Sequence, residues 1–111
     1  MNFTEYQQGA AKTAIYPSSS PIEALSYVTM GLVGEAGEIA NKVKKILRDD
    51  AGIVTEGHKR ALGVEIGDVL WYLSQLSTEL GWDLDWLAAN NLEKLRSRAA
   101  RGTLQGSGDN R

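Results

Sequence analysis

The stretch GLVGEAGEIANKVKK, residues 31–45, decides how this chain folds. Its apolar residues recur at helical spacing, yet Glu35 interrupts them, three residues after Leu32 and four before Ile39. Residues three or four apart lie on one face of a helix, so the Glu35 carboxylate is expected on the face that should enter a core. A negative charge in that position needs compensation, and the chain around it indicates what kind.

The apolar periodicity extends outward from this stretch and predicts an all-α fold. Helices are expected over about residues 3–16, 21–47, 56–80 and 84–100. The breaker YPSSSP separates the first two, with Pro21 as an early helical residue. Gly81 is expected to close the third helix as a glycine C-cap, and Asp83 to cap the start of the fourth.

Each of the last three helices has apolar residues that we expect to be buried. In the second helix they are Leu25, Val28, Leu32, Ile39, Val43 and Ile46. In the third helix they are Leu62, Val69, Leu73, Leu76 and Leu80. In the fourth helix they are Trp86, Leu87, Leu92 and Leu95. The pattern stops after residue 100, where RGTLQGSGDNR is rich in glycine and polar residues.

A second acid intrudes on the apolar stripe of the third helix. In VEIGDVLWYL, Glu65 lies three residues after Leu62 and four before Val69. Each intruding acid has a companion one helical turn later, Glu38 after the first and Asp68 after the second, and residues three apart project side by side. Both pairs therefore have the same form, an acid, two other residues, and an acid.

The two pairs come to one level if the second and third helices form an antiparallel hairpin. With the turn inside residues 48–55, Glu35 lies level with Asp68, and Glu38 lies level with Glu65. Four carboxylates crowded in a partly apolar seam cannot all stay ionised without compensation. Either their pKa values rise or cations bind between them.

A divalent cation is the more economical compensation. Mg²⁺ prefers oxygen ligands in octahedral geometry and is often shared with substrate phosphates, and Mn²⁺ is an expected substitute. The acids are flanked by small residues that we expect to let the helices approach: Gly34, Gly37, Gly63 and Gly67. Acids at this spacing also occur on solvated helices, but two level pairs favour a metal site. Neither pair includes a histidine, which argues against a ferritin-like di-iron centre.

Charge and composition limit the remaining classes of protein. With 12 Lys plus Arg against 14 Asp plus Glu, the formal charge of −2 offers no general attraction to nucleic acid or to an anionic membrane. No apolar run approaches the roughly 20 residues of a membrane span, and MNFTEYQQ does not resemble a signal peptide. The chain has no cysteine, which excludes disulfides and thiolate sites. We expect a cytoplasmic protein.

The 111 residues are expected to form a single helical domain, residues 1–100, followed by a Gly-rich tail, residues 101–111. The size of the domain makes association with a second copy favourable. The tail has two interpretations. It is either a mobile polar segment or a segment that folds over bound phosphates with help from a partner subunit.

These motifs resemble the MazG-like family, the all-α nucleoside triphosphate pyrophosphohydrolases. The family signature is E-E-x-x-E followed on the next helix by E-x-x-D, which GEAGE and EIGD match except that Gly34 stands at the first acid. The resemblance also covers GDVLWYLSQLSTELG, NLEKLRSR and the RG…GSGD ending, so it spans most of the chain beyond residue 25.

The resemblance implies a four-helix MazG-like bundle that forms a dimer or a dimer of dimers. It implies a Mg²⁺-dependent reaction that converts a (d)NTP and water to the (d)NMP and pyrophosphate, in cleaning or tailoring a nucleotide pool. The implied metal ligands are Glu35, Glu38, Glu65 and Asp68. Either Glu35 or Glu38 would also orient or deprotonate the attacking water.

The resemblance and the helical spacing also indicate substrate contacts. An N-x-x-K motif in relatives is associated with the nucleotide, and here Asn91, Lys94 and Arg98 share one helix face. Lys44 and Lys45 lie two to three turns after the acids of their helix. They either meet the β and γ phosphates or form a solvated helix end favoured by the helix dipole.

The aromatic residues have competing interpretations. Tyr72 lies one turn after Asp68 and is either a base or sugar contact or a half-buried tyrosine of the bundle. Trp71, Trp82 and Trp86 are interpreted as core or dimer-interface residues in preference to base-stacking ones. Two alternatives to the triphosphate reaction remain open. One is a related hydrolase acting on a nucleoside diphosphate or phosphoribosyl-ATP, and the other is a non-catalytic helical interaction module that binds a structural cation.

Overall fold

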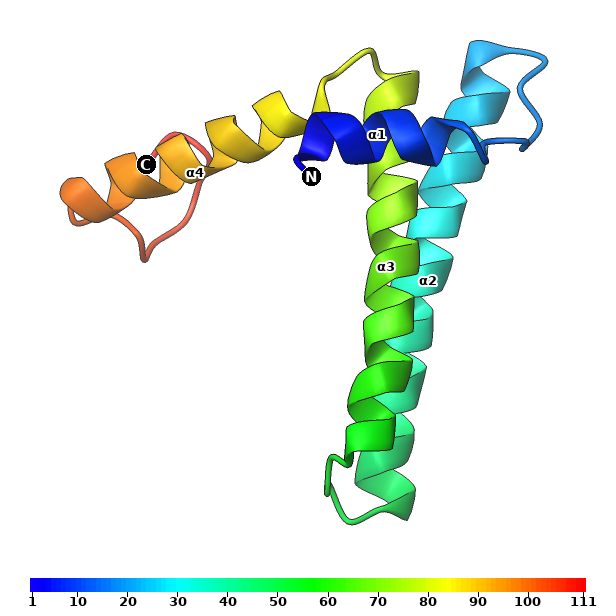
Figure 1. Ribbon diagram of the computed structural model, residues 1–111. Coiled ribbons are helices and arrows are strands. Elements are labelled where there is room, and N and C mark those ends of the chain that lie inside the picture. Colours follow the sequence, from blue (N-terminus) through cyan, green and yellow to red (C-terminus); the bar gives the residue numbers. More distant parts are fainter.

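The structure is a computed structural model that describes all residues from 1 to 111. It contains four helices and no strand (Figure 1). They are α1 (Phe3–Ala11), α2 (Pro21–Asp49), α3 (Glu56–Glu79) and α4 (Leu84–Ala100). The all-α class predicted from the apolar periodicity is confirmed. None of the four helices combines the length and apolar character that crossing a bilayer requires.

Each helix begins at a side chain that caps a backbone N–H group of its first turn. The capping residues are Asn2, Ser20, Thr55 and Asp83. At the start of α3 the cap is reciprocal. The Thr55 hydroxyl accepts from the His58 N–H at 3.1 Å, and the His58 Nδ1 accepts from the Thr55 N–H at 3.1 Å. Such caps satisfy N–H donors that have no partner within the helix. The four helices begin where the sequence predicted them to begin.

The first helix ends earlier than the apolar pattern predicts. It was expected to reach about residue 16, but it stops at Ala11, and that expectation is wrong. The Thr13 hydroxyl donates to the Ala10 carbonyl at 3.0 Å, and the Ile15 N–H donates to the Thr13 carbonyl at 3.1 Å. These local bonds compete with helix continuation, and they free Tyr16 to reach across to α3.

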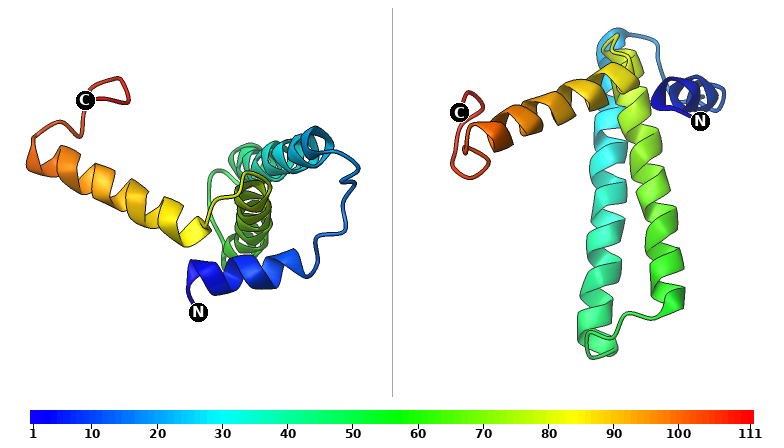
Figure 2. Two further views of the ribbon diagram at one scale, coloured as in Figure 1. Left: turned by 90° about the horizontal axis from the view of Figure 1, so that it is seen from above. Right: turned by 60° about the vertical axis from the view of Figure 1, so that its left-hand side comes forward.

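Helices α2 and α3 form a long antiparallel hairpin, which both views of the ribbon show (Figures 1 and 2). The chain turns at Ala51 and Gly52, which have left-handed φ values of 53° and 75°. Glycine adopts this conformation without steric cost. The Gly52 N–H donates to the Ile46 carbonyl at 3.1 Å and so closes the end of α2. The hairpin and the position of its turn agree with the register inferred from the two acidic pairs.

The other two helices meet the hairpin near its open end. Helix α1 crosses α3, and α4 projects away from the hairpin (Figures 1 and 2). Gln7 joins these elements. Its amide nitrogen donates to the Thr78 hydroxyl at 3.0 Å and to the Trp82 carbonyl at 2.9 Å, and its amide oxygen accepts from the Leu84 N–H at 2.8 Å.

The buried part of the chain is small. Only eight of 111 residues are buried, and the radius of gyration is 17.1 Å, whereas a compact chain of this length has about 13 Å. The apolar buried residues are Ala10, Ala24, Val28 and Ile46. Apolar surface on the hairpin and on α4 therefore faces solvent in the single chain.

The buried face of α3 differs from the expected leucine stripe. Leu73 and Leu80 are 39 % and 54 % exposed, whereas Ser74, Gln75 and Ser77 are buried. The expectation that both leucines enter the core is wrong for the single chain. The reason is that α1 and the segment after it pack on a face of α3 that carries polar side chains. On this face Gln75 donates to the Tyr16 hydroxyl at 3.1 Å. The exposed residues Val43, Trp86, Leu92 and Leu95 depart from the expected stripes in the same way.

The glycine that permits close packing is Gly31. A Cβ atom at Gly31 would overlap the ring of Tyr72, so this ring lies directly on the α2 backbone. The four glycines that flank the acids were expected to let the helices approach, but a Cβ atom at any of them would meet open space. That expectation is not supported, because the close contact lies one turn before the first acid.

Replacing Gly31 by alanine is expected to lower stability by roughly 1–3 kcal/mol, because the added methyl group displaces the Tyr72 ring. A matched change in α1, Gly9→Ala, is expected to raise stability by about 0.5–1 kcal/mol, since its Cβ atom meets nothing and alanine favours the helix. Chemical denaturation of both variants measures the difference. Equal effects of the two changes would contradict this packing.

Candidate functional site

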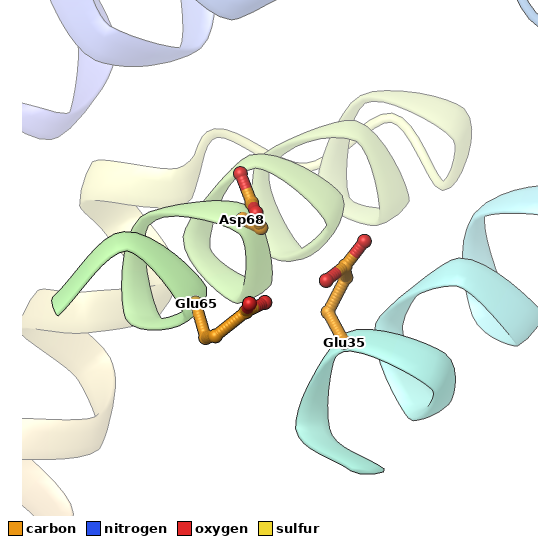
Figure 3. A group of neighbouring side chains, drawn as sticks. All are labelled: Glu35, Glu65 and Asp68. Atoms are coloured by element: carbon orange, nitrogen blue, oxygen red, sulfur yellow. The ribbon is translucent and has the colours of Figure 1, made fainter. Parts of the chain in front are cut away.

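Three carboxylates meet across the hairpin. Glu35 projects from α2 toward Glu65 and Asp68 on α3 (Figure 3). One carboxylate oxygen from each lies within 4.8 Å of the others. Sequence spacing predicted that these three acids would come to one level, and the hairpin brings them together.

The cluster is electrostatically strained. Partial burial raises the pKa of Glu35 above its ordinary value, a hydrogen bond to Glu65 adds to this, and repulsion from Asp68, Glu65 and Glu38 raises the pKa further. One cation contacts the cluster, the Lys42 ammonium, 3.6 Å from Glu65. A single ammonium does not neutralise three carboxylates, so the site favours a further positive charge.

The donor set fits a hard divalent cation. Carboxylate oxygens are the ligands that Mg²⁺ prefers, and octahedral Mg²⁺ holds oxygens at about 2.0–2.1 Å, which puts opposite ligands about 4.2 Å apart. One carboxylate oxygen each of Glu35, Glu65 and Asp68 lies within 4.8 Å of the other two, a limit somewhat wider than the separation of ligands around one ion. Small rotations of these side chains would close the gap.

Glu38 lies outside this group. It is exposed on α2, one turn after Glu35, and none of its oxygens joins the three-carboxylate cluster. Its charge still contributes to the raised pKa of Glu35. Sequence spacing placed it level with Glu65, but in the single chain the partner of Glu65 is Lys42. Lys42 was not among the predicted site residues, although its position seven residues after Glu35 puts it on the same helix face.

A cavity of about 330 Å³ opens beside the cluster and is lined by Glu35, Asp68, Trp71 and Tyr72. Tyr72 therefore lies next to the acids, as its spacing from Asp68 predicted. Burial raises the pKa of the Tyr72 hydroxyl, and Tyr27, Glu35 and Asp68 contribute to the rise. The cavity combines charged oxygens on one side with aromatic rings on the other.

The two predicted lysines of α2 lie farther along the hairpin. Lys44 is exposed. Lys45 lines a separate cavity of about 180 Å³ near the turn, together with Lys42 and with His58, whose Nε2 is 3.1 Å from the Asp50 carboxylate. Neither lysine is brought into the cluster, and Lys42 is the residue of α2 that links the two regions.

The candidate residues of α4 also lie apart from the cluster. Asn91 and Lys94 are exposed on a helix that projects away from the hairpin (Figure 1). Arg98 is 5 % exposed, and its guanidinium donates to the Asp109 carbonyl at 3.0 Å. In the single chain Arg98 is thus occupied in holding the tail against α4.

The tail folds back through its arginines. The Arg111 side chain donates to the carbonyls of Thr103, Gly108 and Leu104 at 3.2, 2.8 and 3.1 Å. Arg101 donates to the terminal carbonyl oxygen of Arg111 at 2.9 Å. The polar composition alone did not reveal this loop, because the arginine donors act on backbone carbonyls that no side-chain pattern specifies.

Comparison with known proteins supports the resemblance seen in the acidic motifs. The family model for the MazG nucleotide pyrophosphohydrolase domain matches residues 24–102. The Gene 37 protein of Mycobacterium phage L5 is 56% identical over 114 residues, and the alignment covers all of both chains. No solved structure matches the chain. The matched range contains the whole acidic cluster.

Glu35→Gln is expected to raise the melting temperature at pH 7 without divalent metal by roughly 2–5 °C. The pKa of Glu35 is raised in the folded state, which means that ionising this carboxyl destabilises the fold. The protein therefore loses stability as the pH rises through that pKa, and glutamine avoids this loss because it has no charge. The gain should disappear below about pH 4, where the carboxyl is protonated. Thermal denaturation across pH measures it, and a loss of stability at pH 7 would contradict the strained cluster.

Added Mg²⁺ should reverse the order of the two proteins. The parent is expected to gain more in melting temperature than Glu35→Gln, because an ion that binds only the folded state stabilises it by mass action. An equal gain in both would mean that Glu35 does not bind the ion. Glu56→Gln is a suitable control, since Glu56 is exposed at the start of α3 and pairs only with Lys59.

Proposed function

This chain belongs to the MazG nucleotide pyrophosphohydrolase domain family, and we propose that it is a Mg²⁺-dependent enzyme that hydrolyses (d)NTPs to (d)NMPs and pyrophosphate. The observation that carries the proposal is the cluster of Glu35, Glu65 and Asp68, which faces a cavity large enough for part of a nucleotide. Such an enzyme would clean or tailor a nucleotide pool. Mg²⁺ is the proposed cofactor, with Mn²⁺ as a substitute.

The roles of the acids follow from their positions. Glu35, Glu65 and Asp68 would hold the metal, which when bound neutralises phosphate charge and lowers the pKa of a coordinated water. Glu38, exposed one turn away and outside the cluster, is free to orient that water and accept its proton. The water oxygen bonds to the α phosphorus, the bond from this phosphorus to the bridging oxygen breaks, and pyrophosphate leaves.

A second copy of the chain completes this proposal. The single chain buries few residues, and the apolar side chains of α4, including Trp86, Leu92 and Leu95, are 39 to 50 % exposed. Covering them against the hairpin of a second copy would bury apolar surface on both chains. The same contact would bring Asn91 and Lys94 to the acidic cluster of the partner, which their own chain does not do. We propose a homodimer or a dimer of dimers.

The activity is tested by incubating the protein with Mg²⁺ and a panel of ribo- and deoxynucleoside triphosphates, with mono-, di- and pyrophosphate products resolved. Monophosphate and pyrophosphate are expected from the parent. Glu65→Gln should lower the rate by roughly 100-fold or more, because a metal ligand is lost, while Glu56→Gln should retain it. Release of single phosphates would contradict this reaction. If no triphosphate is turned over, nucleoside diphosphates and phosphoribosyl-ATP are tested next; turnover of only these would contradict the triphosphate reaction, and no turnover of any substrate would favour an interaction module.

The assembly is tested by light scattering coupled to size-exclusion chromatography. A mass of two or four times the 12.1 kDa of one chain is expected. Leu95→Glu should shift it toward one chain, since burying an unpaired charge in an interface is costly. The neighbouring change Glu93→Gln should leave the mass unchanged. A fully active particle of 12.1 kDa would refute the second copy.

A further inference from the structure

One cation, the Lys42 ammonium, lies at the edge of the acidic cluster. Lys42 is on α2 and its partner Glu65 is on α3, so this ion pair crosses the hairpin. The Lys42 side chain is 38 % exposed, whereas that of Glu65 is 14 % exposed. No other ion pair of the chain reaches the cluster. The compensation of the acids by the protein itself therefore depends on one side chain.

The contact between these two side chains is loose. The Lys42 nitrogen and the Glu65 oxygen are 3.6 Å apart, whereas charged hydrogen bonds from nitrogen to oxygen are about 2.7–2.9 Å long. A lysine ammonium is a strongly hydrated point charge on a flexible stem, and it has no fixed geometry toward a carboxylate. The attraction thus comes from charge alone, and nothing in the geometry locks Lys42 in place.

Lys42 also has a second place available to it. Its side chain lines the cavity of about 180 Å³ near the hairpin turn, and Lys45, Asp50 and His58 are among the other lining residues. The Asp50 carboxylate is the negative group of that cavity, and it lies 3.1 Å from the His58 Nε2. Rotation about the bonds of its stem would take the ammonium away from Glu65 and into this cavity while both helices stay in place.

The ammonium and a divalent ion compete for the same carboxylate. Glu65 belongs to the group of three acids that could hold an ion, and it is the acid that Lys42 contacts. Two cations beside one carboxylate repel each other, and the repulsion is stronger where solvent is partly excluded. The divalent ion would be attracted by three acids and the ammonium by one, so the ammonium is the cation that leaves.

We propose that Lys42 is the counter-ion of the empty cluster and that it leaves Glu65 for the turn cavity when a divalent ion binds. The ammonium only changes its place. It touches neither the ion nor the substrate, so Lys42 is a positioning residue that acts through Glu65. The inference rests on the proposed function for the identity of the ion, which is Mg²⁺.

Removing this ammonium should have opposite effects on stability and on metal affinity. Lys42→Met keeps the apolar stem and loses the charge. Without divalent metal the three carboxylates lose their counter-ion, and the melting temperature should fall by roughly 1–5 °C. A divalent ion no longer has to displace the ammonium, so its dissociation constant should fall by roughly 2–5-fold. A lysine that merely holds Glu65 in place for the ion would give a rise in that constant instead.

The first test measures the binding of Mn²⁺ alone to the full-length protein, with free Mn²⁺ followed by its electron paramagnetic resonance signal. Lys42→Met should bind Mn²⁺ more tightly than the parent. Lys42→Arg keeps the charge, so it should bind Mn²⁺ no more tightly than the parent. Lys59→Met is the matched control, because it removes an ion pair of the same hairpin, with Glu56 at 3.1 Å, and neither partner belongs to the cluster. Its affinity for Mn²⁺ should equal that of the parent.

The second test follows the movement of the ammonium. His58 is the one histidine of the chain, so its imidazole signals in an NMR spectrum need no further assignment. Mg²⁺ should shift these signals in the parent, because the Lys42 ammonium enters the cavity that His58 lines. Mg²⁺ should leave the same signals unchanged in Lys42→Met.

Several results would overturn the inference. In Lys42→Met they are Mn²⁺ binding no tighter than in the parent, or a melting temperature without metal that is no lower. In Lys42→Arg it is a gain in affinity equal to that of Lys42→Met. In the parent they are unshifted His58 signals or no binding of Mn²⁺.

Failure of this inference is distinguishable from failure of the proposed function. Opposite shifts of stability and metal affinity in Lys42→Met, without hydrolysis of any nucleotide by the parent, would contradict the enzyme alone. Hydrolysis of triphosphates by the parent, with a Mn²⁺ affinity that Lys42→Met does not change, would contradict the role of Lys42 alone.

Discussion

The repulsion between Glu35 and the acids of α3 is the constraint on which the rest of this structure depends. Three carboxylates within 4.8 Å of one another destabilise the hairpin that carries them, and Lys42 offsets only part of that charge. A cation bound in the cluster would remove the strain that the hairpin imposes, and folding would then be linked to metal binding. The long, well-capped helices α2 and α3 are what keep these side chains opposed in spite of their charge.

The elements outside the hairpin complete the surroundings of this cluster. Gly31 lets the Tyr72 ring lie on the backbone of α2, next to Glu35. The segment after α1 leaves its helix early, and its Thr13 hydroxyl accepts from the Trp71 indole N–H at 3.0 Å. The rings of Trp71 and Tyr72 are thus held beside the charged cavity.

Much of the fold could be predicted from local rules. Three features depend only on neighbours in sequence: the capping residues, the turn at Ala51 and Gly52, and the spacing of the acids. Together they predicted the hairpin and the three acids of the cluster. The end of α1 could not be predicted, because the apolar pattern does not reveal the local bonds of Thr13 and Ile15 that compete with the helix. The polar buried face of α3 could not be predicted either, because it depends on a long-range contact between Tyr16 and Gln75. Lys42 was missed for a related reason, since its partner Glu65 lies on the other helix.

The central claim is that Glu35, Glu65 and Asp68 together hold a divalent metal. Crystals of the protein grown with Mn²⁺ and measured near the manganese absorption edge would test it most directly. The account predicts an anomalous difference peak between these three side chains, within bonding distance of an oxygen from each. Manganese bound elsewhere with this cluster empty, or no bound manganese at all, would contradict it.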